Sequence, residues 1–233
     1  MPRPSQRIDE ALLHSGRELF PQLGCAGLSV RAVAERAGAN QGMFHYHFKT
    51  KDNFLRVLLQ QMYEEMFAGL SGEVRHEGPA LERLSAALLV MGRFAREHRR
   101  LMARLWMDAM AGEPVAREFF QRNLPRHLTL LIGLMQEAQA EGALGELAPL
   151  QRFVFVMGSV LMPILFASGL FELVIEHPAL QRQFAAQVMS DEAIAQRVSL
   201  ALAALGGRTA SSPVRRARTS RRRAPASGDG AAP

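Results

Sequence analysis

The hydrophobic positions of this chain recur every three or four residues along most of its length, which is the spacing of amphipathic helices. Between residues 8 and 55 the repeats are short and are interrupted near Gly24 and Gly38. Beyond residue 53 the repeats are longer and follow one another closely, and alternating patterns typical of strands are nearly absent. The pattern predicts an all-α protein of about nine helices, with a three-helix unit before a larger helical body.

A helix, a glycine turn and a second short helix are predicted between Ser29 and Phe48. Ser29 is placed to cap the first of these helices, and Gly38 to end it in the left-handed conformation. Asn40 would cap the second helix. Phe44 and Phe48, four residues apart, would point back into a small core, which leaves polar and aromatic side chains facing outward. This layout is that of a helix-turn-helix whose second helix enters the DNA major groove.

The outward side chains of this unit are groups that hydrogen-bond to nucleic acid. Gln41 and Arg31 suit base edges, because an amide and a guanidinium each bond a base at two points. Tyr46, His47 and Lys51 suit phosphates, which fix register without reading sequence. The candidate residues for binding double-stranded DNA are Ser29, Arg31, Asn40, Gln41, Gly42, Met43, His45, Tyr46, His47 and Lys51.

From about Ile8 to Leu55 the sequence resembles the DNA-binding domain of the tetracycline-repressor (TetR) family of bacterial transcriptional regulators. The resemblance rests on the apolar positions of the first helix, predicted from Ile8 to Leu23, and on the run from Gln41 to Lys51. Met43 and His45 depart from the family pattern, which commonly has Ser or Thr in place of Met43 and Tyr in place of His45. The operator sequence therefore cannot be taken from relatives.

The resemblance implies a domain organisation and a function. A helix-turn-helix DNA-binding domain would occupy residues 1–52, with the motif at about 29–48, and a ligand-binding and dimerisation domain residues 53–206. The expected function is that of a repressor which a small, mainly apolar molecule releases from its operator. Because one short recognition helix discriminates weakly, two copies about 34–36 Å apart are expected to read a near-palindrome as a homodimer.

Longer helices are predicted in the body. Thr50 would cap a helix that carries apolar residues every four positions and joins the two domains. Another helix is predicted from Pro114 to about Glu141, and Pro125 inside it should bend or split it. The last helix is predicted from Asp191 to Leu205. Its stripe of apolar residues would form a dimer seam, made of Ile194, Val198, Ala201 and Leu205.

Residues 153–171 contain no charge, and this length alone would permit a transmembrane helix. The same pattern arises when the protein core covers one side of a helix and a second subunit covers the other. Insertion would place the arginine-rich tail away from the anionic cytoplasmic face and leave the preceding amphipathic helices unpartnered. No membrane association is therefore expected. The alternative is a membrane-attached helix-turn-helix regulator.

A ligand pocket is expected among the middle helices, as the resemblance implies. Methionines and aromatic residues adapt to varied apolar shapes, and a few polar groups would anchor the ligand. The candidates are Phe94, Met102, Trp106, Met110, Phe119, Asn123, His127, Met135, Met157 and Ser159. For any single one of them, ordinary core packing is the favoured explanation. Asp108 is expected to pair with Arg104, four residues earlier on the same helix.

The net charge of +6 is concentrated at one end of the chain. Residues 208–233 carry seven arginines against one aspartate, whereas residues 1–52 carry seven basic against five acidic side chains. The tail is rich in Arg, Ala, Ser, Pro and Gly, so residues 207–233 are expected to be disordered. It would either add nonspecific phosphate contacts or be functionally neutral.

Because Cys25 is the single cysteine, no internal disulfide can form, which fits a reducing cytoplasm. The resemblance implies a cytoplasmic bacterial protein that associates with the nucleoid through DNA binding. Cys25 is interpreted as a half-buried apolar side chain, with a redox sensor as the alternative. No phosphate-binding loop, nucleophile motif or pair of metal ligands at helical spacing occurs, so neither catalytic residues, a metal nor a cofactor is expected. The chain is therefore not expected to be an enzyme.

Overall fold

The computed structural model of the protein describes residues 6–167 and 174–206, and these ranges contain ten α-helices, two π-helical turns and no strand. The N-terminal unit comprises α1 (Gln6–Gly27), α2 (Val30–Arg36) and α3 (Gln41–Phe48). The body comprises α4 (Lys51–Arg75), α5 (Ala80–Glu97), α6 (Arg99–Met110), α7 (Pro114–Ala140), α8 (Pro149–Val160), η1 (Pro163–Ala167), α10 (Pro178–Phe184), η2 (Ala185–Met189) and α11 (Asp191–Gly206). The predicted all-α architecture with a small N-terminal unit is confirmed.

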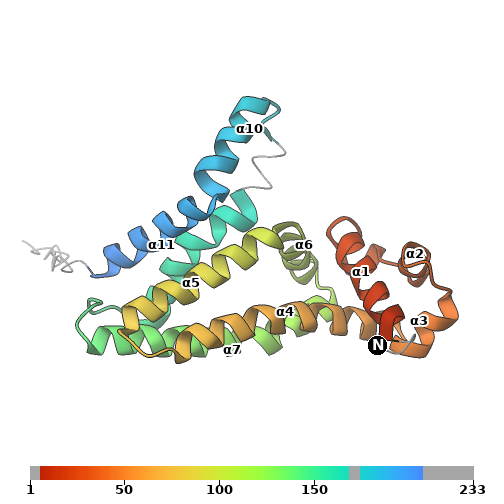
Figure 1. The fold of residues 1–233 in the computed structure, drawn as a ribbon, viewed down its shortest axis with the longest axis horizontal. Helices are drawn as coiled ribbons and strands as arrows, with labels where there is room; N and C mark the ends of the chain where they lie inside the picture. The colour runs from red at the N-terminus through yellow and green to blue at the C-terminus, as the bar shows by residue number, and fades with distance from the viewer. Residues whose placement is uncertain (1–5, 168–173, 207–233) are drawn as a thin grey trace, which may run out of the picture.

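The N-terminal unit lies at one end of an elongated molecule, and α4 runs from it along the body (Figure 1). Helices α4 and α7 lie side by side, and α5 packs on both of them. The side chain of Thr50 caps α4, because its Oγ1 accepts a hydrogen bond from the backbone N–H of Asn53 at 3.1 Å. The predicted domain division after residue 52 falls within the first turn of α4, so the two parts share one helix.

The core of the body follows the predicted apolar stripes. Phe54, Leu58, Met62 and Met66 are buried along α4, as their four-residue spacing indicates. Of the two alternatives expected at Pro125, a split does not occur, because α7 continues through this proline as one helix of 27 residues. Packing of α7 against four other body helices holds it together where the backbone hydrogen bond is missing.

The uncharged segment beginning at residue 153 forms α8 and η1, and its residues 168–171 lie outside the described part. Phe153 and Val156 of α8 face inward and are buried, whereas Val154 is 66% exposed. Within the described ranges one stretch, Pro149–Phe166, is long and apolar enough to cross a membrane by length and composition, and 28% of it is buried. The helix therefore has one face in the protein core and one apolar face outside it.

Arg152, which directly precedes the uncharged segment, is completely buried. Its guanidinium donates hydrogen bonds to the backbone oxygens of Met135 at 3.2 Å and Gly145 at 2.8 Å, and to Oε1 of Gln139 at 2.7 Å. Burial without a carboxylate partner lowers the pKa of this guanidinium below its usual range. These bonds tie the start of α8 to α7 and to the loop between them.

The stripe predicted as the dimer seam of α11 was assigned to the wrong partner. Ile194, Val198 and Ala201 are buried inside the protomer, where α11 packs on α5 and α8. The opposite face of α11 carries Leu200, which is 70% exposed. Helical spacing identifies a buried face but does not say whether the same chain or a second one covers it.

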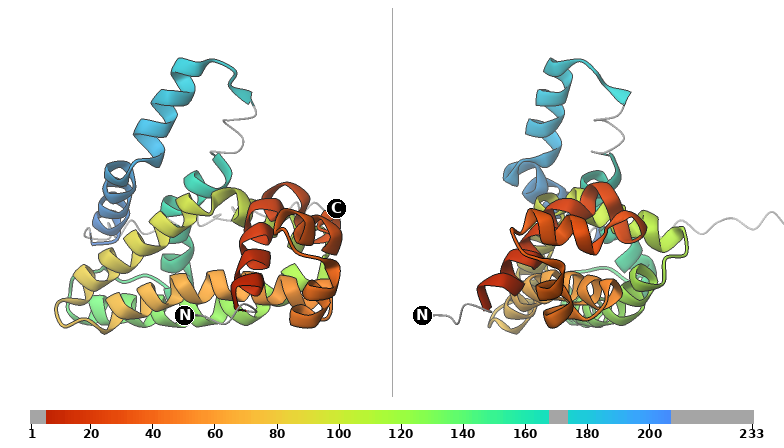
Figure 2. Two further views of the ribbon diagram at one scale, coloured as in Figure 1. Left: turned by 45° about the vertical axis from the view of Figure 1, so that its right-hand side comes forward. Right: turned by 90° about the vertical axis from the view of Figure 1, so that its right-hand side faces the viewer.

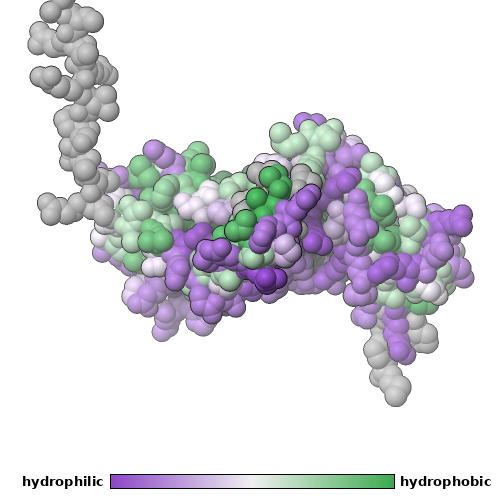
Figure 3. All heavy atoms as spheres, turned by 90° about the horizontal axis from the view of Figure 1, so that it is seen from above, coloured by the Kyte–Doolittle hydropathy of each residue, from purple (hydrophilic) through white to green (hydrophobic). Residues whose placement is uncertain are grey.

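Helix α10 and the turn η2 project from the body as an arm, and neither contains a buried residue (Figure 2). Seen from above, the molecule exposes apolar residues, drawn in green, at the end where α11 finishes (Figure 3). The arginine-rich tail, predicted to be disordered over residues 207–233, lies outside the described residues.

Candidate DNA-binding interface

Two side-chain hydrogen bonds and a glycine turn place the two helices of the motif. Oγ of Ser29 accepts from the N–H of Ala32 at 3.2 Å, and Oδ1 of Asn40 accepts from the N–H of Met43 at 2.9 Å. Gly38 has φ of 64° and ends α2 in the left-handed region. The predicted caps and turn are therefore confirmed, and they use the polar atoms of Ser29 and Asn40 within the motif.

An aromatic cluster supports the recognition helix α3 from behind. Phe44 and Phe48 are buried, as predicted, and their ring centroids lie 5.0 and 4.9 Å from that of Phe54 on α4. The edge-on and tilted arrangements are those that aromatic rings favour. The cluster fixes which face of α3 points inward, so the opposite face is turned to solvent.

The solvent-facing side of the motif contains five of the predicted DNA-binding residues. Gln41, Gly42 and His45 are exposed, and Tyr46 is 67% exposed. The Arg31 side chain is 81% exposed, and its Nε lies 3.9 Å from Oε2 of Glu35, a loose surface pair that leaves the guanidinium available. These five residues form what we call the reading face.

The orientation of His45 is set by the end of the helix. Its Nδ1 lies 2.9 Å from the backbone oxygen of Lys49, and since a carbonyl only accepts, Nδ1 must carry the proton. In the neutral ring Nε2 is then an acceptor. It can receive a hydrogen bond from an exocyclic amino group of a base in the major groove.

Lys49 occupies a strained position that sequence reasoning did not single out. Its φ of 63° and ψ of −56° place it at the centre of a γ-turn, closed by the N–H of Thr50 donating to the oxygen of Phe48 at 2.7 Å. The side chain is exposed and its Nζ lies 5.8 Å from the centroid of the Tyr46 ring. The turn therefore puts a cation beside the reading face.

Three of the predicted DNA-binding side chains are less accessible to DNA than expected. Met43 and His47 are half-buried, and Nε2 of His47 is enclosed without a hydrogen-bond partner. Lys51 was expected to reach phosphate, but its ammonium donates to the backbone oxygens of Cys25 at 3.0 Å and Ala26 at 3.2 Å. The prediction missed this contact because the acceptors lie 25 and 26 residues earlier in the chain.

Three of the predicted pocket residues come together where α4 packs on α7. Asn123 and Phe119 are buried and His127 is half-buried around Tyr63, whose hydroxyl donates to the backbone oxygen of Asn123 at 3.0 Å. The side chains of Gln60 and Asn123 exchange two hydrogen bonds, of 3.2 and 3.1 Å. Burial raises the pKa of Tyr63 to about 12 and lowers that of His127. Sequence analysis did not identify Tyr63 or Gln60, because their partners lie some 60 residues away.

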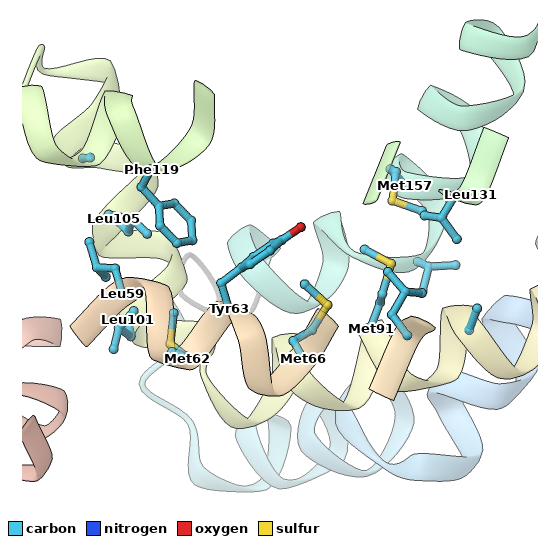
Figure 4. Close-up of a cluster of buried hydrophobic side chains, with 14 of the residues drawn as sticks. Leu59, Met62, Tyr63, Met66, Met91, Leu101, Leu105, Phe119, Leu131 and Met157 are labelled. Carbon is cyan, nitrogen blue, oxygen red and sulfur yellow. The ribbon is translucent and has the colours of Figure 1, made fainter. Parts of the chain in front are cut away.

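The other predicted pocket residues lie elsewhere in the body. Met157 and Met135 are buried, and Met157 packs near Leu131 and Met91, apart from Tyr63 and Phe119 (Figure 4). Trp106 is 43% exposed and Met110 is 76% exposed, so neither is enclosed. The Phe94 ring lies 4.4 Å from that of His98 at a tilt of 49°. Met102 is half-buried, and the Ser159 hydroxyl donates to the backbone of its own helix.

The space beside Phe119 is small. A hollow of about 10 Å³ opens there, which is room for one water molecule. It is lined by Arg56, Leu59, Gln60, Val115, Glu118, Phe119 and Arg122. A larger molecule would enter only if side chains between α4 and α7 moved. Among the described residues no group of three or more His, Cys, Asp and Glu side chains is placed to hold a metal ion.

Cys25 is 3% exposed, and burial together with the nearby Asp108 carboxylate raises the pKa of its thiol to about 12. Because the thiolate is the reactive form, such a thiol is inert near neutral pH. The structure therefore supports the interpretation as a buried apolar side chain over that as a redox sensor. Arg104 and Asp108 pair as predicted, with Nε 2.9 Å from Oδ1.

Comparison with known proteins finds similarity to bacterial transcriptional regulators. Residues 12–58 match the family model described as bacterial regulatory proteins, tetR family. The transcriptional repressor Rv3405c of Mycobacterium tuberculosis is 29% identical over 134 residues, which are 56% of this chain and 61% of that protein. The alignment thus spans less than two thirds of the length of this relative.

Two solved structures share the fold across most of the chain. A putative TetR-family regulator from Rhodococcus sp. has a TM-score of 0.60 at 22% identity, over 87% of this chain and all of that one. The regulator FadR from Bacillus subtilis, solved in complex with stearoyl-CoA, has a TM-score of 0.61 at 16% identity, over 78% of this chain and 98% of that one. The N-terminal unit, residues 12–58, is therefore similar to the DNA-binding domain of the bacterial regulatory proteins of the tetR family, and the described residues share the fold of these solved structures.

Proposed function

We propose that this chain is a sequence-specific DNA-binding transcriptional repressor that acts as a homodimer in the bacterial cytoplasm. The observation that carries the proposal is the reading face, whose five residues are exposed on a helix-turn-helix held by two caps and an aromatic cluster. A glutamine and an arginine supply two-point contacts to bases, and Tyr46 and Lys49 are placed for phosphates. The curated repressors that the chain resembles support the sign of regulation.

Selection of duplexes from a random pool by the full chain tests the proposal. We expect one near-palindromic sequence to be enriched. Fluorescence anisotropy then measures the affinity for that duplex and for duplexes changed at one base pair per half-site. In Gln41→Ala, the preference for the selected base at one such position should fall about tenfold. Gln136→Ala, which removes an exposed glutamine from α7, is the control and should bind as wild type does. A folded chain that prefers no duplex over random competitor would refute the function.

The homodimer is proposed to form through the outer faces of α8 and α11. Leu150, Val154 and Phe155 of α8 and Leu200 of α11 are exposed, at 62%, 66%, 42% and 70%. Apolar side chains grouped in this way mark interaction surfaces. This face replaces the seam expected from the sequence, which is covered inside the protomer.

Analytical ultracentrifugation tests the dimer. Val154→Glu should place a charge in the interface, produce monomers at micromolar concentration and weaken operator binding, because two linked half-sites are no longer read together. Met110→Glu changes an equally exposed apolar residue on α6 and should remain dimeric. A monomeric wild-type protein that binds its operator with full affinity would contradict this part of the proposal.

The effector is proposed to be a small, mainly apolar molecule that enters between α4 and α7. The polar group formed by Tyr63, Asn123 and His127 lies against Phe119, a combination suited to an apolar ligand with one polar end. That FadR was solved with stearoyl-CoA makes long-chain acyl compounds the first probes.

The ligand test is a titration of the protein–operator complex with stearoyl-CoA, with stearate and with shorter acyl chains. An effector must bind the DNA-free state more tightly, since equal affinity for both states shifts nothing. We expect one of these chain lengths to raise the melting temperature and to release the operator. A compound that raises the melting temperature but leaves operator affinity unchanged is not the effector.

A further inference from the structure

The last turn of α1 is held by cations that belong to other helices. The helix is interrupted at Gly24, with φ of 66° and ψ of −169°, and its own last turn carries no basic residue. Arg104 of α6 donates to the backbone oxygens of Gln22 at 3.3 Å and Leu23 at 3.1 Å. Because the carbonyl end of a helix is negative, a guanidinium there stabilises it.

The carboxylate of Asp108 completes the contact from the same helix. It is 5% exposed, its Oδ1 accepts from Nε of Arg104 at 2.9 Å, and its Oδ2 accepts from the backbone N–H of Cys25 at 2.7 Å. Both oxygens are therefore used. An ion pair of this kind contributes to stability only when all its hydrogen-bond partners are in place. The contribution of the pair therefore depends on the position of α1.

Gly24 is what lets the guanidinium lie so close to the backbone. A Cβ at this position would be 2.2 Å from Nε of Arg104, and the positive φ would strain any other residue. The conformation of α1 and the path of the Arg104 side chain therefore require each other.

We propose that Arg104 and Asp108 are a positioning pair that fixes the orientation of the recognition helix relative to the body. The N-terminal unit is joined to the body through α4, on which α1 packs at Phe54 and to which the Arg17–Glu65 pair ties it at 2.6 Å. The Arg104–Asp108 pair attaches the C-terminal end of α1 to α6 as well, so a tilt of the unit that shifts or bends α4 meets a second restraint. In the dimer it thereby sets the spacing and angle between the two reading faces. The proposal deepens the proposed function and, in its DNA readout, rests on it.

The DNA readout is the dependence of binding on half-site spacing. Duplexes selected by the wild-type chain are remade with one base pair added or removed between the half-sites, which moves and rotates one half-site relative to the other. Wild type should lose about tenfold in affinity per base pair, a loss similar to that of a mismatch. On the same duplexes, Arg104→Met and Asp108→Asn should lose threefold or less in affinity per base pair, which is about half of the wild-type loss on a logarithmic scale. Arg122→Met, which breaks an ion pair of the same spacing on α7, should match wild type.

A DNA-free readout separates failure of the pair from failure of the proposed function. Spin labels at Tyr46→Cys and Gln136→Cys, in chains diluted with unlabelled protein, report the distance between α3 and α7 by electron–electron resonance. The distance distribution should be narrow in the wild-type and Arg122→Met backgrounds and broad with Arg104→Met. A distribution that stays narrow in Arg104→Met, or a lowered melting temperature with an unchanged spacing profile, would overturn the proposal. If the wild type selects no duplex, the proposed function fails, and the spin-label result still decides the pair.

Discussion

Replacing Gly16 with alanine should destabilise the protein, although alanine favours helices. Gly16 lies in the interior of α1, where a Cβ would be 2.6 Å from Cζ and 2.9 Å from Cε1 of Phe54, and 3.2 Å from Cδ2 of Leu58. Carbon atoms not bonded to each other are normally about 3.5–4.0 Å apart. The added methyl group therefore requires the Phe54 ring to move.

The ring has little room to move. Phe54 is completely buried, and its centroid is 5.0 Å from that of Phe44 and 4.9 Å from that of Phe48. Overpacking of a well-filled core costs about 1–3 kcal/mol. The gain in helix propensity from glycine to alanine is about 1 kcal/mol. The steric cost is larger, so we expect the free energy of unfolding to fall by about 1 kcal/mol.

Gly133→Ala is the matched control, because it also changes a glycine inside a helix but its Cβ would meet nothing within 4 Å. It should raise the free energy of unfolding by up to about 1 kcal/mol. Urea unfolding followed by far-UV circular dichroism measures both variants, and a difference of about 2 kcal/mol between them is expected. If Gly16→Ala proved as stable as Gly133→Ala, the packing of α1 on Phe54 would be wrong.

Three further predictions concern single side chains. Cys25 should resist alkylation at pH 8 until urea unfolds the chain. Because folding raises the pKa of its thiol from 9.0 to about 12, the thiol loses its proton at lower pH in the unfolded chain than in the folded one. The free energy of unfolding should therefore fall between pH 9 and pH 12 in the wild type, and Cys25→Ala should not show this fall. Burial lowers the pKa of His127 below 6.5, so as the pH falls the unfolded chain binds this proton before the folded one, and the free energy of unfolding should fall below pH 6.5. The urea midpoint of His127→Gln should fall less over this range. A midpoint that depends on pH as in the wild type would contradict the assignment. Lys49→Gly should relieve the strained γ-turn and raise the melting temperature, while operator affinity falls; an unchanged melting temperature would refute the strain.

Local features of this chain were predictable from sequence, whereas contacts between distant segments were not. The caps at Ser29, Asn40 and Thr50 each depend on a backbone N–H three residues further on, so residue type and spacing determine them. The buried face of α3 follows in the same way from Phe44 and Phe48.

The errors arose where a side chain had a choice of partners. Lys51 has the charge and position to meet a phosphate, but the carbonyls at the end of α1 are within its reach and occupy it. The stripe of Ile194, Val198 and Ala201 was correctly identified as buried, but the sequence does not show that α5 and α8 cover it. Hydrophobic periodicity gives the direction of a face and not the identity of what packs on it.

The attachments of the N-terminal unit suggest how an effector between body helices would act on DNA binding. Helix α4 is fastened to α7 by Arg56–Glu118 at 2.9 Å and by the pair of Arg126 with Glu64 at 2.6 Å, while α1 is attached to α6. Because the unit is held by two different body helices, a shift of α6 relative to α7 would move α1 and α4 by unequal amounts and rotate α3. A shift common to both helices would carry the unit along without rotation. An effector would therefore release DNA only to the extent that it binds the separated arrangement of α6 and α7 more tightly than the DNA-bound arrangement, and tight binding to both would release nothing.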